Sequence, residues 1–127
     1  MFAAGLHPKR LLVVEDDDVQ RRAIMDLLKL PGYLVMGASS GEEALKYIYK
    51  NIDLVVIDFN MGALTGGDVL KTWLRINPGT HFIFLTAEDR LETAVMMIRS
   101  GATDYLTKPM DPDALLARIG EALHFVC

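Results

Sequence analysis

Five short apolar runs alternate along the chain with longer segments in which apolar residues recur at spacings of three and four. The runs are RLLVV (10–14), YLVM (33–36), DLVVID (53–58), HFIFLT (81–86) and DYLT (104–107). Continuous apolar runs of this length are typical of buried strands, and the spacing of three and four is typical of amphipathic helices. The pattern therefore predicts five strands, each followed by a helix.

The helical segments carry start and stop signals. The first is expected to start at Asp17 or Asp18 and to stop at Pro31, and the second to be capped by Ser39 or Ser40. The third ends at the NPG of 77–79, the fourth at the glycine of 101, and the fifth starts near 111–112. The expected apolar faces are Val19, Ala23, Leu27 and Leu30; Val69, Leu70, Trp73 and Leu74; Leu91, Ala94, Val95 and Ile98; and Leu115, Leu116, Ile119 and Leu123.

Strict alternation of strand and helix predicts a parallel sheet with helices on both faces. The runs at 10–14, 53–58 and 81–86 are the most continuously apolar, so we expect these strands at the centre and the other two at the edges. The predicted fold is a doubly wound, flavodoxin-like three-layer sandwich with strand order 2-1-3-4-5 and five helices. It forms one domain over 1–127, with a core at about 10–124. Ligands of such sheets bind beyond the carboxyl ends of the strands.

Composition narrows the class of protein. The chain has 127 residues, 51% of them hydrophobic and 24% charged, which suits one globular domain. A net charge of −4 argues against a primary role in coating nucleic acid or anionic membranes. No apolar run approaches the roughly 20 residues that span a bilayer, the start MFAAGLHPKR lacks the order of a secretion signal, and Cys127 is the single cysteine. We expect a cytoplasmic protein without direct contact to membrane or nucleic acid.

Polar side chains follow four of the five predicted strands at their carboxyl ends. Glu15 and Asp16 follow the first strand, Asp58 ends the third, Thr86 ends the fourth and Lys108 follows the fifth. Three neighbouring carboxylates repel one another unless a cation is present, and Mg²⁺ accepts an all-oxygen set of ligands. A carboxylate is already ionised near pH 7 and needs no separate base to attack a phosphoryl group. If Asp58 is the nucleophile, Mg²⁺ would shield and orient an incoming phosphoryl group at this edge of the sheet.

Four segments at this end of the sheet carry a family resemblance. They are LLVVEDD, DLVVIDFNM followed by glycine, FIFLTA and GATDYLTKP. In this order and spacing, the chain resembles the receiver domain of two-component response regulators, from about Arg10 to Leu123. The resemblance implies a domain that accepts a phosphoryl group from a histidine kinase or phosphotransfer protein and controls an output domain or partner protein. It implies no enzyme activity beyond the domain's own phosphorylation and dephosphorylation.

The resemblance assigns roles around the metal. Asp58 matches the phosphoacceptor and also a metal ligand. Asp16 matches a direct ligand of Mg²⁺, while Glu15 stands where the family usually has an acid that acts mainly through water. Asn60 stands where the family supplies a backbone carbonyl to the metal.

The resemblance also assigns roles on the phosphoryl side. Thr86, followed by Ala87, matches the switch hydroxyl that moves toward the phosphoryl group. Tyr105 matches the aromatic switch residue that turns inward when that space opens. Lys108 matches the lysine that pairs with the phosphoryl group, and Pro109 the proline after it, which often follows a cis peptide bond in this family.

One position departs from the family pattern. The loop after the phosphoacceptor commonly has a proline where this chain has Gly62, although Gly66 farther on is present as expected. Glycine removes the restraint that proline places on φ, so we expect a more mobile loop. Altered rates of phosphorylation or dephosphorylation would follow, without loss of activity.

Two other functions share parts of this pattern. A phosphohydrolase of the haloacid-dehalogenase type also uses a strand-end aspartate with Mg²⁺, but it usually has a second aspartate two residues later, where this chain has Asn60, and it carries a cap domain. A pseudo-receiver would keep the fold as a binding module without phosphorylation. The complete acidic set and Lys108 argue against that reading.

Several residues near the site have simpler explanations. Asp17 and Asp18 are expected to cap the first helix, and Asp53 to be a turn residue at the entry of the third strand. Met96 and Met97 are expected to leave apolar surface on the fourth helix. The fourth helix, fifth strand and fifth helix would then form a partner-binding face, which a phosphorylation-dependent homodimer could use.

The sequence does not name an output. Nothing after the fifth helix would bind DNA, so we expect a single-domain regulator or a receiver excised from a longer protein. The stretch ETAVMMIRSGATDYLTKPMDPDAL is similar to receivers attached to AAA+ activators of sigma-54 promoters or related multidomain regulators. Residues 1–9 are either native or an added extension.

Overall fold

The computed structural model describes residues 7–87 and 91–124, so the first six residues and Cys127 lie outside it. Five strands and five helices alternate as predicted. They are β1 (Arg10–Val14), α1 (Asp18–Lys29), β2 (Leu34–Ala38), α2 (Gly41–Leu45), β3 (Leu54–Ile57), α3 (Gly66–Ile76), β4 (His81–Thr86), α4 (Leu91–Arg99), β5 (Asp104–Thr107) and α5 (Pro112–His124). All neighbouring strands pair in parallel, in the order β2-β1-β3-β4-β5. The doubly wound fold predicted from the sequence is confirmed.

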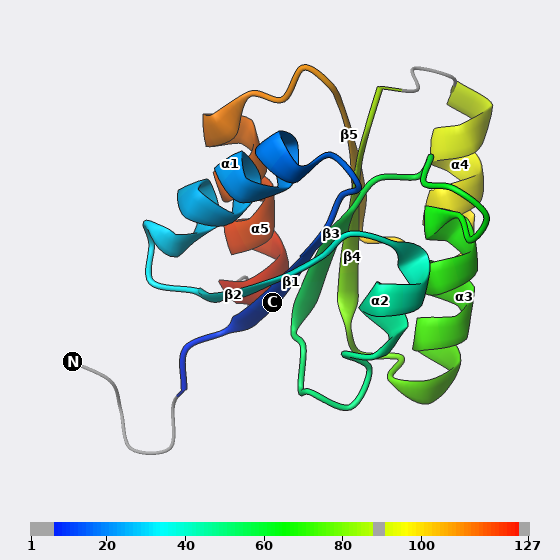
Figure 1. The fold of residues 1–127 in the computed structure, drawn as a ribbon, viewed down its shortest axis with the longest axis horizontal. Coiled ribbons are helices and arrows are strands. Elements are labelled where there is room, and N and C mark those ends of the chain that lie inside the picture. The colour runs from blue at the N-terminus through cyan, green and yellow to red at the C-terminus, as the bar shows by residue number, and fades with distance from the viewer. Residues whose placement is uncertain (1–6, 88–90, 125–127) are drawn as a thin grey trace.

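The sheet is covered on both faces. Helices α1 and α5 lie on one side and α2, α3 and α4 on the other (Figure 1). Successive side chains of a strand point to opposite faces, and β1 shows the result: Leu11 and Val13 pack under α1 and α5, whereas Leu12 and Val14 pack on the other side. Two apolar clusters therefore form, which explains why the central strands are continuously apolar.

The predicted apolar face of α1 is wrong except at Leu27, which packs partly in the core. Val19 and Leu30 are 80% and 78% exposed, and the buried residues are Ile24 and Leu28. The predicted series and the pair Ile24 and Leu28 both fit a spacing of three and four, so spacing alone does not choose between them. The Asp17 side chain caps the helix as predicted, and the helix docks on the sheet through Ile24 and Leu28.

The prediction for α4 is half right. Met96 is 56% exposed, but Met97 is buried, and Leu91 and Ile98 of the predicted apolar face are exposed. Met97 reaches α3 at Gly67, where an added Cβ would lie only 3.3 Å from the methionine methyl carbon. The small residue on α3 creates the space that Met97 fills, and a pattern read along α4 alone cannot show this.

Strand β2 starts one residue later and ends two residues later than the predicted 33–36, because its ladder with β1 runs from Arg10 opposite Leu34 to Val14 opposite Ala38. Asp53 lies at the entry edge of the sheet, where its side chain accepts a hydrogen bond from the Arg10 amide at 2.8 Å. Among the described helices, none is both long and apolar enough to cross a bilayer.

Candidate functional site

The ladders of the central strands bring the first two acids together. The Glu15 amide donates to the Ala38 carbonyl at 3.1 Å, and the Asp58 amide donates to the Val14 carbonyl at 3.2 Å. Pairing therefore continues one residue past β1 and β3 on the same edge. Glu15 and Asp58 stand side by side because β1 and β3 are neighbours in the sheet.

Three carboxylates form a cluster at this edge. Oxygen atoms of Glu15, Asp16 and Asp58 all lie within 4.8 Å of one another. Glu15 and Asp58 are buried, whereas Asp16 is exposed and keeps the cluster open to solvent. A set of carboxylate oxygens with one open side is the donor set that Mg²⁺ or Ca²⁺ accepts.

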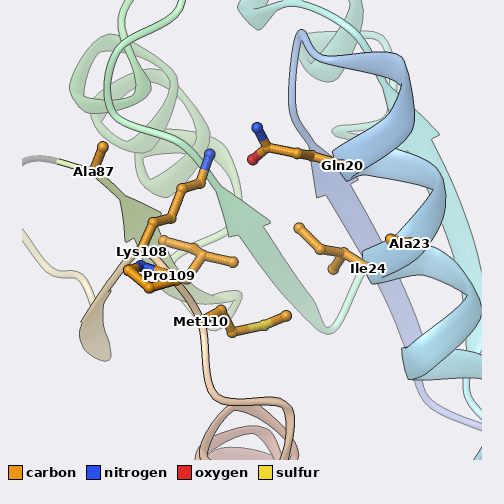
Figure 2. A pocket seen from close by; sticks show the side chains of 8 residues that line it. Gln20, Ala23, Ile24, Ala87, Lys108, Pro109 and Met110 are labelled. Atoms are coloured by element: carbon orange, nitrogen blue, oxygen red, sulfur yellow. The ribbon is translucent and has the colours of Figure 1, made fainter.

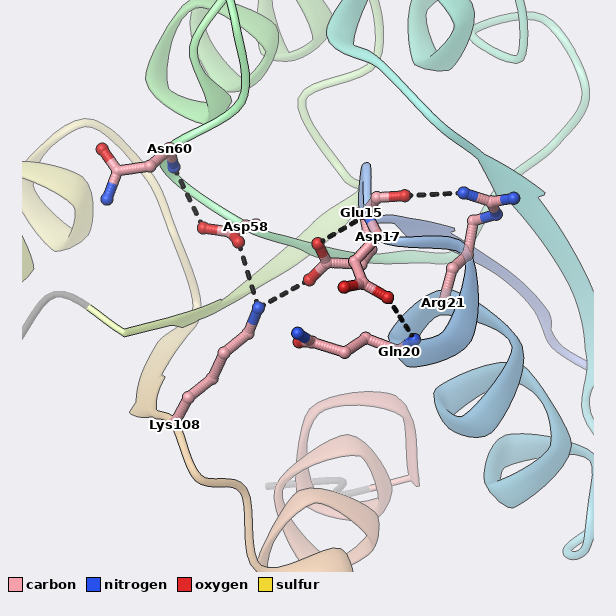
Figure 3. Close-up of polar contacts among 7 residues, drawn as sticks. All are labelled: Glu15, Asp17, Gln20, Arg21, Asp58, Asn60 and Lys108. Carbon is pink, nitrogen blue, oxygen red and sulfur yellow. Dashed lines mark hydrogen bonds and ion pairs between the residues drawn. The ribbon is translucent and has the colours of Figure 1, made fainter.

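Lys108 brings one positive charge to the cluster from the end of β5. Its ammonium donates to Glu15 Oε1 at 2.6 Å and to Asp58 Oδ2 at 3.1 Å (Figure 3). The Lys108 amide donates to the Thr86 carbonyl at 2.8 Å, and the peptide bond to Pro109 is cis. Burial is the largest single influence on the Lys108 pKa and lowers it, but the two carboxylates together outweigh it and raise the pKa above its usual value.

One ammonium does not neutralise the cluster. Burial is the largest cause of a raised pKa at Glu15, and the neighbouring Asp16 adds to it. The hydrogen bonds from Lys108 and from the Asp17 amide, the latter at 3.2 Å, oppose the rise without cancelling it. Because Lys108 is shared between two acids, the site keeps excess negative charge. That charge and the oxygen ligands together fit a divalent cation.

The loop after β3 holds Asp58 from its other side. The Asn60 amide donates to Asp58 Oδ1 at 3.0 Å, so both oxygens of this carboxylate have a donor. The Asn60 side chain points away from the cluster (Figure 3). Each carboxylate oxygen still has a further lone pair, so these contacts orient Asp58 without blocking it.

Gly66 packs directly against the acceptor residue. A Cβ added at Gly66 would lie 2.6 Å from the Asp58 carbonyl oxygen and 2.8 Å from a ring carbon of Phe84. Real Cβ atoms do not approach that closely, so the first residue of α3 can sit here only as glycine. This contact sets how closely α3 approaches the end of β3.

Gly62 adopts a conformation that proline cannot. Its φ is +57°, in the left-handed region, whereas the proline ring fixes φ near −65°. The position therefore differs from the usual family loop in backbone shape as well as in restraint. No neighbour lies within 4 Å of an added Cβ, so the preference for glycine here comes from the backbone alone.

The remaining predicted residues lie around the cluster. Thr86 is fully buried as the last residue of β4, and Ala87 is exposed just beyond it. Tyr105 is partly buried and packs against the apolar cluster on the α3 and α4 side of the sheet. Their positions put Thr86 at the site edge and Tyr105 one strand away from it, next to α4.

An apolar pocket of about 500 Å³ opens beside Lys108. It lies between α1 and the loop after β5, and Figure 2 shows side chains of both segments facing it. The lining residues are Gln20, Ala23, Ile24, Leu85, Ala87, Lys108, Pro109 and Met110. A partner that fills this pocket would stand next to the acidic cluster.

One residue at the site was missed by sequence reasoning. Arg21 of α1 donates to the Glu15 backbone carbonyl at 2.9 Å and pairs with Asp18 at 2.6 Å. A basic residue one turn into a helix that follows an acidic strand end could have signalled this contact. The sequence pattern showed the spacing but not which way the side chain turns.

Comparison with known proteins identifies the same family that the sequence resembles. The family profile described as response regulator receiver domain matches residues 11–120. The chain is 39% identical over 114 residues to the transcriptional regulatory protein ZraR of Escherichia coli, covering 89% of this chain and 26% of that protein. It is 42% identical over 111 residues to the transcriptional regulatory protein DltR of Streptococcus agalactiae, covering 87% and 50%. The chain thus spans a half or less of these relatives.

Solved structures agree over most of the chain. A CheY-like response regulator receiver domain protein from Methanospirillum hungatei matches with a TM-score of 0.87 and 30% identity, over 92% of this chain and 94% of that one. A Burkholderia pseudomallei response regulator, solved with a phosphorylated aspartic acid, a calcium ion and citrate, matches with a TM-score of 0.82 and 28% identity, over 90% and 68%. With the profile match across most of its length, the chain belongs to the response regulator receiver domain family.

Proposed function

We propose that this domain accepts a phosphoryl group on Asp58, with Mg²⁺ bound, from a histidine kinase or phosphotransfer protein. The observation that carries the proposal is the cluster of Glu15, Asp16 and Asp58 within 4.8 Å, with the Lys108 ammonium shared between two of its members. The phosphorylated aspartic acid and calcium ion of the Burkholderia pseudomallei relative support it.

The residues around the metal would divide the work. Asp16, Asp58 and the Asn60 backbone carbonyl would hold the ion, and Glu15 would act mainly through water. A bound Mg²⁺ supplies positive charge that shields the phosphoryl oxygens from the carboxylates and orients the group for transfer. The raised pKa of Glu15 fits a cation in this cluster, because a buried acid with uncompensated charge is stabilised by a positive charge nearby.

The transfer itself would need little from the protein beyond positioning. One oxygen of Asp58 forms the new bond to phosphorus while the bond from phosphorus to the donor atom breaks and its electron pair stays with the donor. Lys108 already contacts Asp58 and would stabilise negative charge on the transferred group. Thr86 and the exposed Ala87 lie on the same edge and would contact its remaining oxygens.

Phosphorylation would then change the surface of the domain. Thr86 would move toward the phosphoryl group, Tyr105 would turn inward, and the population would shift toward a second arrangement of the face formed by α4, β5 and α5. Exposed apolar side chains on α4, among them Met96 and Ile98, make this face suitable for an output domain, a partner protein or a second copy of the chain. ZraR and DltR are transcriptional regulators, and a similar output is proposed here.

The site favours this function over its alternatives. A haloacid-dehalogenase-type hydrolase would need an acid where Asn60 stands, and the Asn60 side chain points away from Asp58 (Figure 3). Turnover of a simple phosphomonoester would support the hydrolase function instead. A pseudo-receiver would not need a lysine shared between two buried acids, and it would fail to bind a beryllofluoride phosphoryl mimic.

Intact-protein mass measurement tests the proposal. Incubation with acetyl phosphate and Mg²⁺ is expected to add the mass of one phosphoryl group to the wild-type protein, and chelation with EDTA to prevent it. Asp58→Asn is expected to remain unlabelled. Asp53→Asn is the matched control, because Asp53 lies at the entry end of the same strand, and it is expected to label fully. Labelling that survives Asp58→Asn would refute the assignment.

A further inference from the structure

Arg21 ties the end of β1 to the first turn of α1. One guanidinium nitrogen donates to the Glu15 backbone carbonyl at 2.9 Å (Figure 3). The other pairs with Asp18 at 2.6 Å. The Arg21 side chain is 20% exposed, so the fork is largely shielded from water, whereas Asp18 is open to solvent. Two acidic residues, Asp16 and Asp17, lie between these anchored ends.

Glu15 is held at four points, and Arg21 provides one of them. Its amide donates to the Ala38 carbonyl, its Oε2 accepts from the Asp17 amide, and its Oε1 accepts from Lys108. Arg21 binds the carbonyl that begins the turn toward Asp16. Of these partners, Arg21 is the one side chain that lies outside the acidic cluster and outside the proposed reaction.

The Arg21 side chain also passes over β2, at Gly37. A Cβ added at Gly37 would lie 3.4 Å from Arg21 Cδ and 2.6 Å from Met25 Sδ. The stem of Arg21 and the end of Met25 therefore pass over a strand position without a side chain. The 3.4 Å distance would be an ordinary contact, so Arg21 passes over β2 here without requiring glycine, and Met25 is the side chain that needs the space.

We propose that Arg21 is a positioning residue, which fixes the 15–17 turn so that Glu15 and Asp16 face Asp58 in the geometry that receives the metal. The inference rests on the proposed function. Arg21 touches neither the carboxylates of the cluster nor the reacting atoms, and it acts through the Glu15 carbonyl. Partners that orient metal-binding groups from outside commonly change metal affinity about 10–100-fold when removed.

Charge and positioning predict opposite signs for the loss of Arg21. A cation beside the cluster repels Mg²⁺, so a pure charge effect would make Mg²⁺ bind more tightly when Arg21 is neutralised. Loss of positioning would make Mg²⁺ bind more weakly. Arg22 is the matched control, because it is the next residue on α1, carries the same charge and is exposed.

The test is Mg²⁺ titration calorimetry on the full chain, with wild type, Arg21→Gln and Arg22→Gln. We expect Arg21→Gln to weaken binding about tenfold and Arg22→Gln to leave it unchanged or slightly tighter. A readout without metal accompanies it: in EDTA, amide hydrogen exchange at Asp17 is expected to accelerate in Arg21→Gln alone, since that amide binds Glu15.

Two further variants keep the test decisive. Arg21→Lys keeps the charge and the aliphatic stem but lacks the forked guanidinium, so it cannot hold both partners. Its Mg²⁺ affinity is expected to fall between those of wild type and Arg21→Gln. This variant replaces Arg21→Gln if Arg21→Gln does not fold. Asp18→Asn keeps the Glu15 contact and is expected to lose less affinity than Arg21→Gln.

Three outcomes would count against the proposal. In the first, Arg21→Gln binds Mg²⁺ as tightly as Arg22→Gln does, and its Asp17 amide exchanges hydrogen at the wild-type rate. This result would overturn the positioning role and leave the proposed function standing. Wild-type protein that binds no Mg²⁺ would overturn both, and it would do so before any variant is compared. Equal weakening in Arg21→Gln and Arg22→Gln would point to a non-specific effect of α1 and would also overturn it.

Discussion

The two ends of the sheet bury polar groups in opposite ways. At the carboxyl end, Glu15, Asp58 and Lys108 are ionisable, and the two acids share one ammonium. At the amino end, the buried groups are neutral: Trp73 Nε1 donates to Thr80 Oγ1 at 3.0 Å, and that hydroxyl donates to the Ile52 carbonyl at 3.3 Å. Both ends are fully hydrogen-bonded, since no buried side-chain nitrogen or oxygen in residues 7–87 and 91–124 lacks a partner.

The difference lies in charge rather than in hydrogen bonding. A neutral donor and acceptor that bind one another compensate for the water that each has lost. Glu15 and Asp58 share one ammonium, so these buried carboxylates are not fully compensated for the water that they have lost. The raised pKa of Glu15 reflects this. The amino end therefore stabilises the fold, and the carboxyl end holds an uncompensated negative charge that fits a divalent cation. Substitutions at the two ends test this contrast.

The largest expected effect is at Gly66. Gly66→Ala would drive a Cβ into the Asp58 carbonyl and Phe84, and should lower the free energy of unfolding by about 2 to 4 kcal/mol. Gly79→Ala is the control near the amino end, where nothing lies within 4 Å of an added Cβ, and should raise it by about 0.4 to 1 kcal/mol. Urea unfolding measures both. Similar values for the two variants would show that Gly66 is not tightly packed.

Thr80→Val comes next. It leaves the indole nitrogen of Trp73 buried without a partner, which should cost about 1 to 3 kcal/mol of stability. Mg²⁺ affinity should stay within twofold of wild type, roughly the scatter expected for independent, distant sites. Thermal unfolding measures the stability, and titration calorimetry on the same sample measures the Mg²⁺ affinity. A large drop in Mg²⁺ affinity would mean that the two ends are coupled, contrary to the comparison.

Gly62→Ala should have a smaller effect. An L-residue in the left-handed region costs roughly 1 kcal/mol, and the open surroundings of Gly62 add nothing. Gly62→Asn should cost less, because Asn51 near the amino end already adopts a φ of +58°. Denaturant unfolding of both variants checks the order. Gly62→Pro should disturb the loop and change phosphorylation and dephosphorylation rates; unchanged rates would show that loop shape does not matter for them.

The smallest expected effect is a pH dependence that comes from Glu15. The pKa of Glu15 is raised in the folded protein above its ordinary value of 4.5. The contribution of Glu15 to stability is therefore complete below pH 4.5 and is lost as the pH rises through the folded-state pKa. Glu15→Gln should flatten that part of the metal-free stability profile and leave the protein at least as stable at pH 7. Guanidinium unfolding from pH 4 to 8 in EDTA measures it. A profile equally steep in Glu15→Gln would assign the dependence to other groups.

The sequence was sufficient for the sheet. Burial on both faces gave β1, β3 and β4 continuous apolar runs, and parallel topology then placed Glu15, Asp58 and Lys108 at one edge. It was not sufficient where two patterns fit equally. Two stripes of α1 satisfy the helical period, and docking on the sheet selected Ile24 and Leu28.

The parts of the site that escaped prediction depend on three-dimensional detail. Arg21 reaches Glu15 because its side chain turns back from α1 to the end of β1, and the sequence does not specify that direction. The burial of Met97 depends on Gly67 of another helix. The positive φ of Gly62 is a property of the loop path, and glycine permits that conformation without requiring it.

The most direct test of the account is to locate the phosphoryl group. After labelling with acetyl phosphate and Mg²⁺, reduction with borohydride converts an aspartyl phosphate to homoserine, which peptide sequencing by mass spectrometry can place. We predict the modification at Asp58 alone, with Glu15 and Asp16 unmodified, because the proposed function assigns those two acids to the metal. Modification at either of those acids, or none at Asp58, would contradict the central claim that Asp58 is the phosphoacceptor.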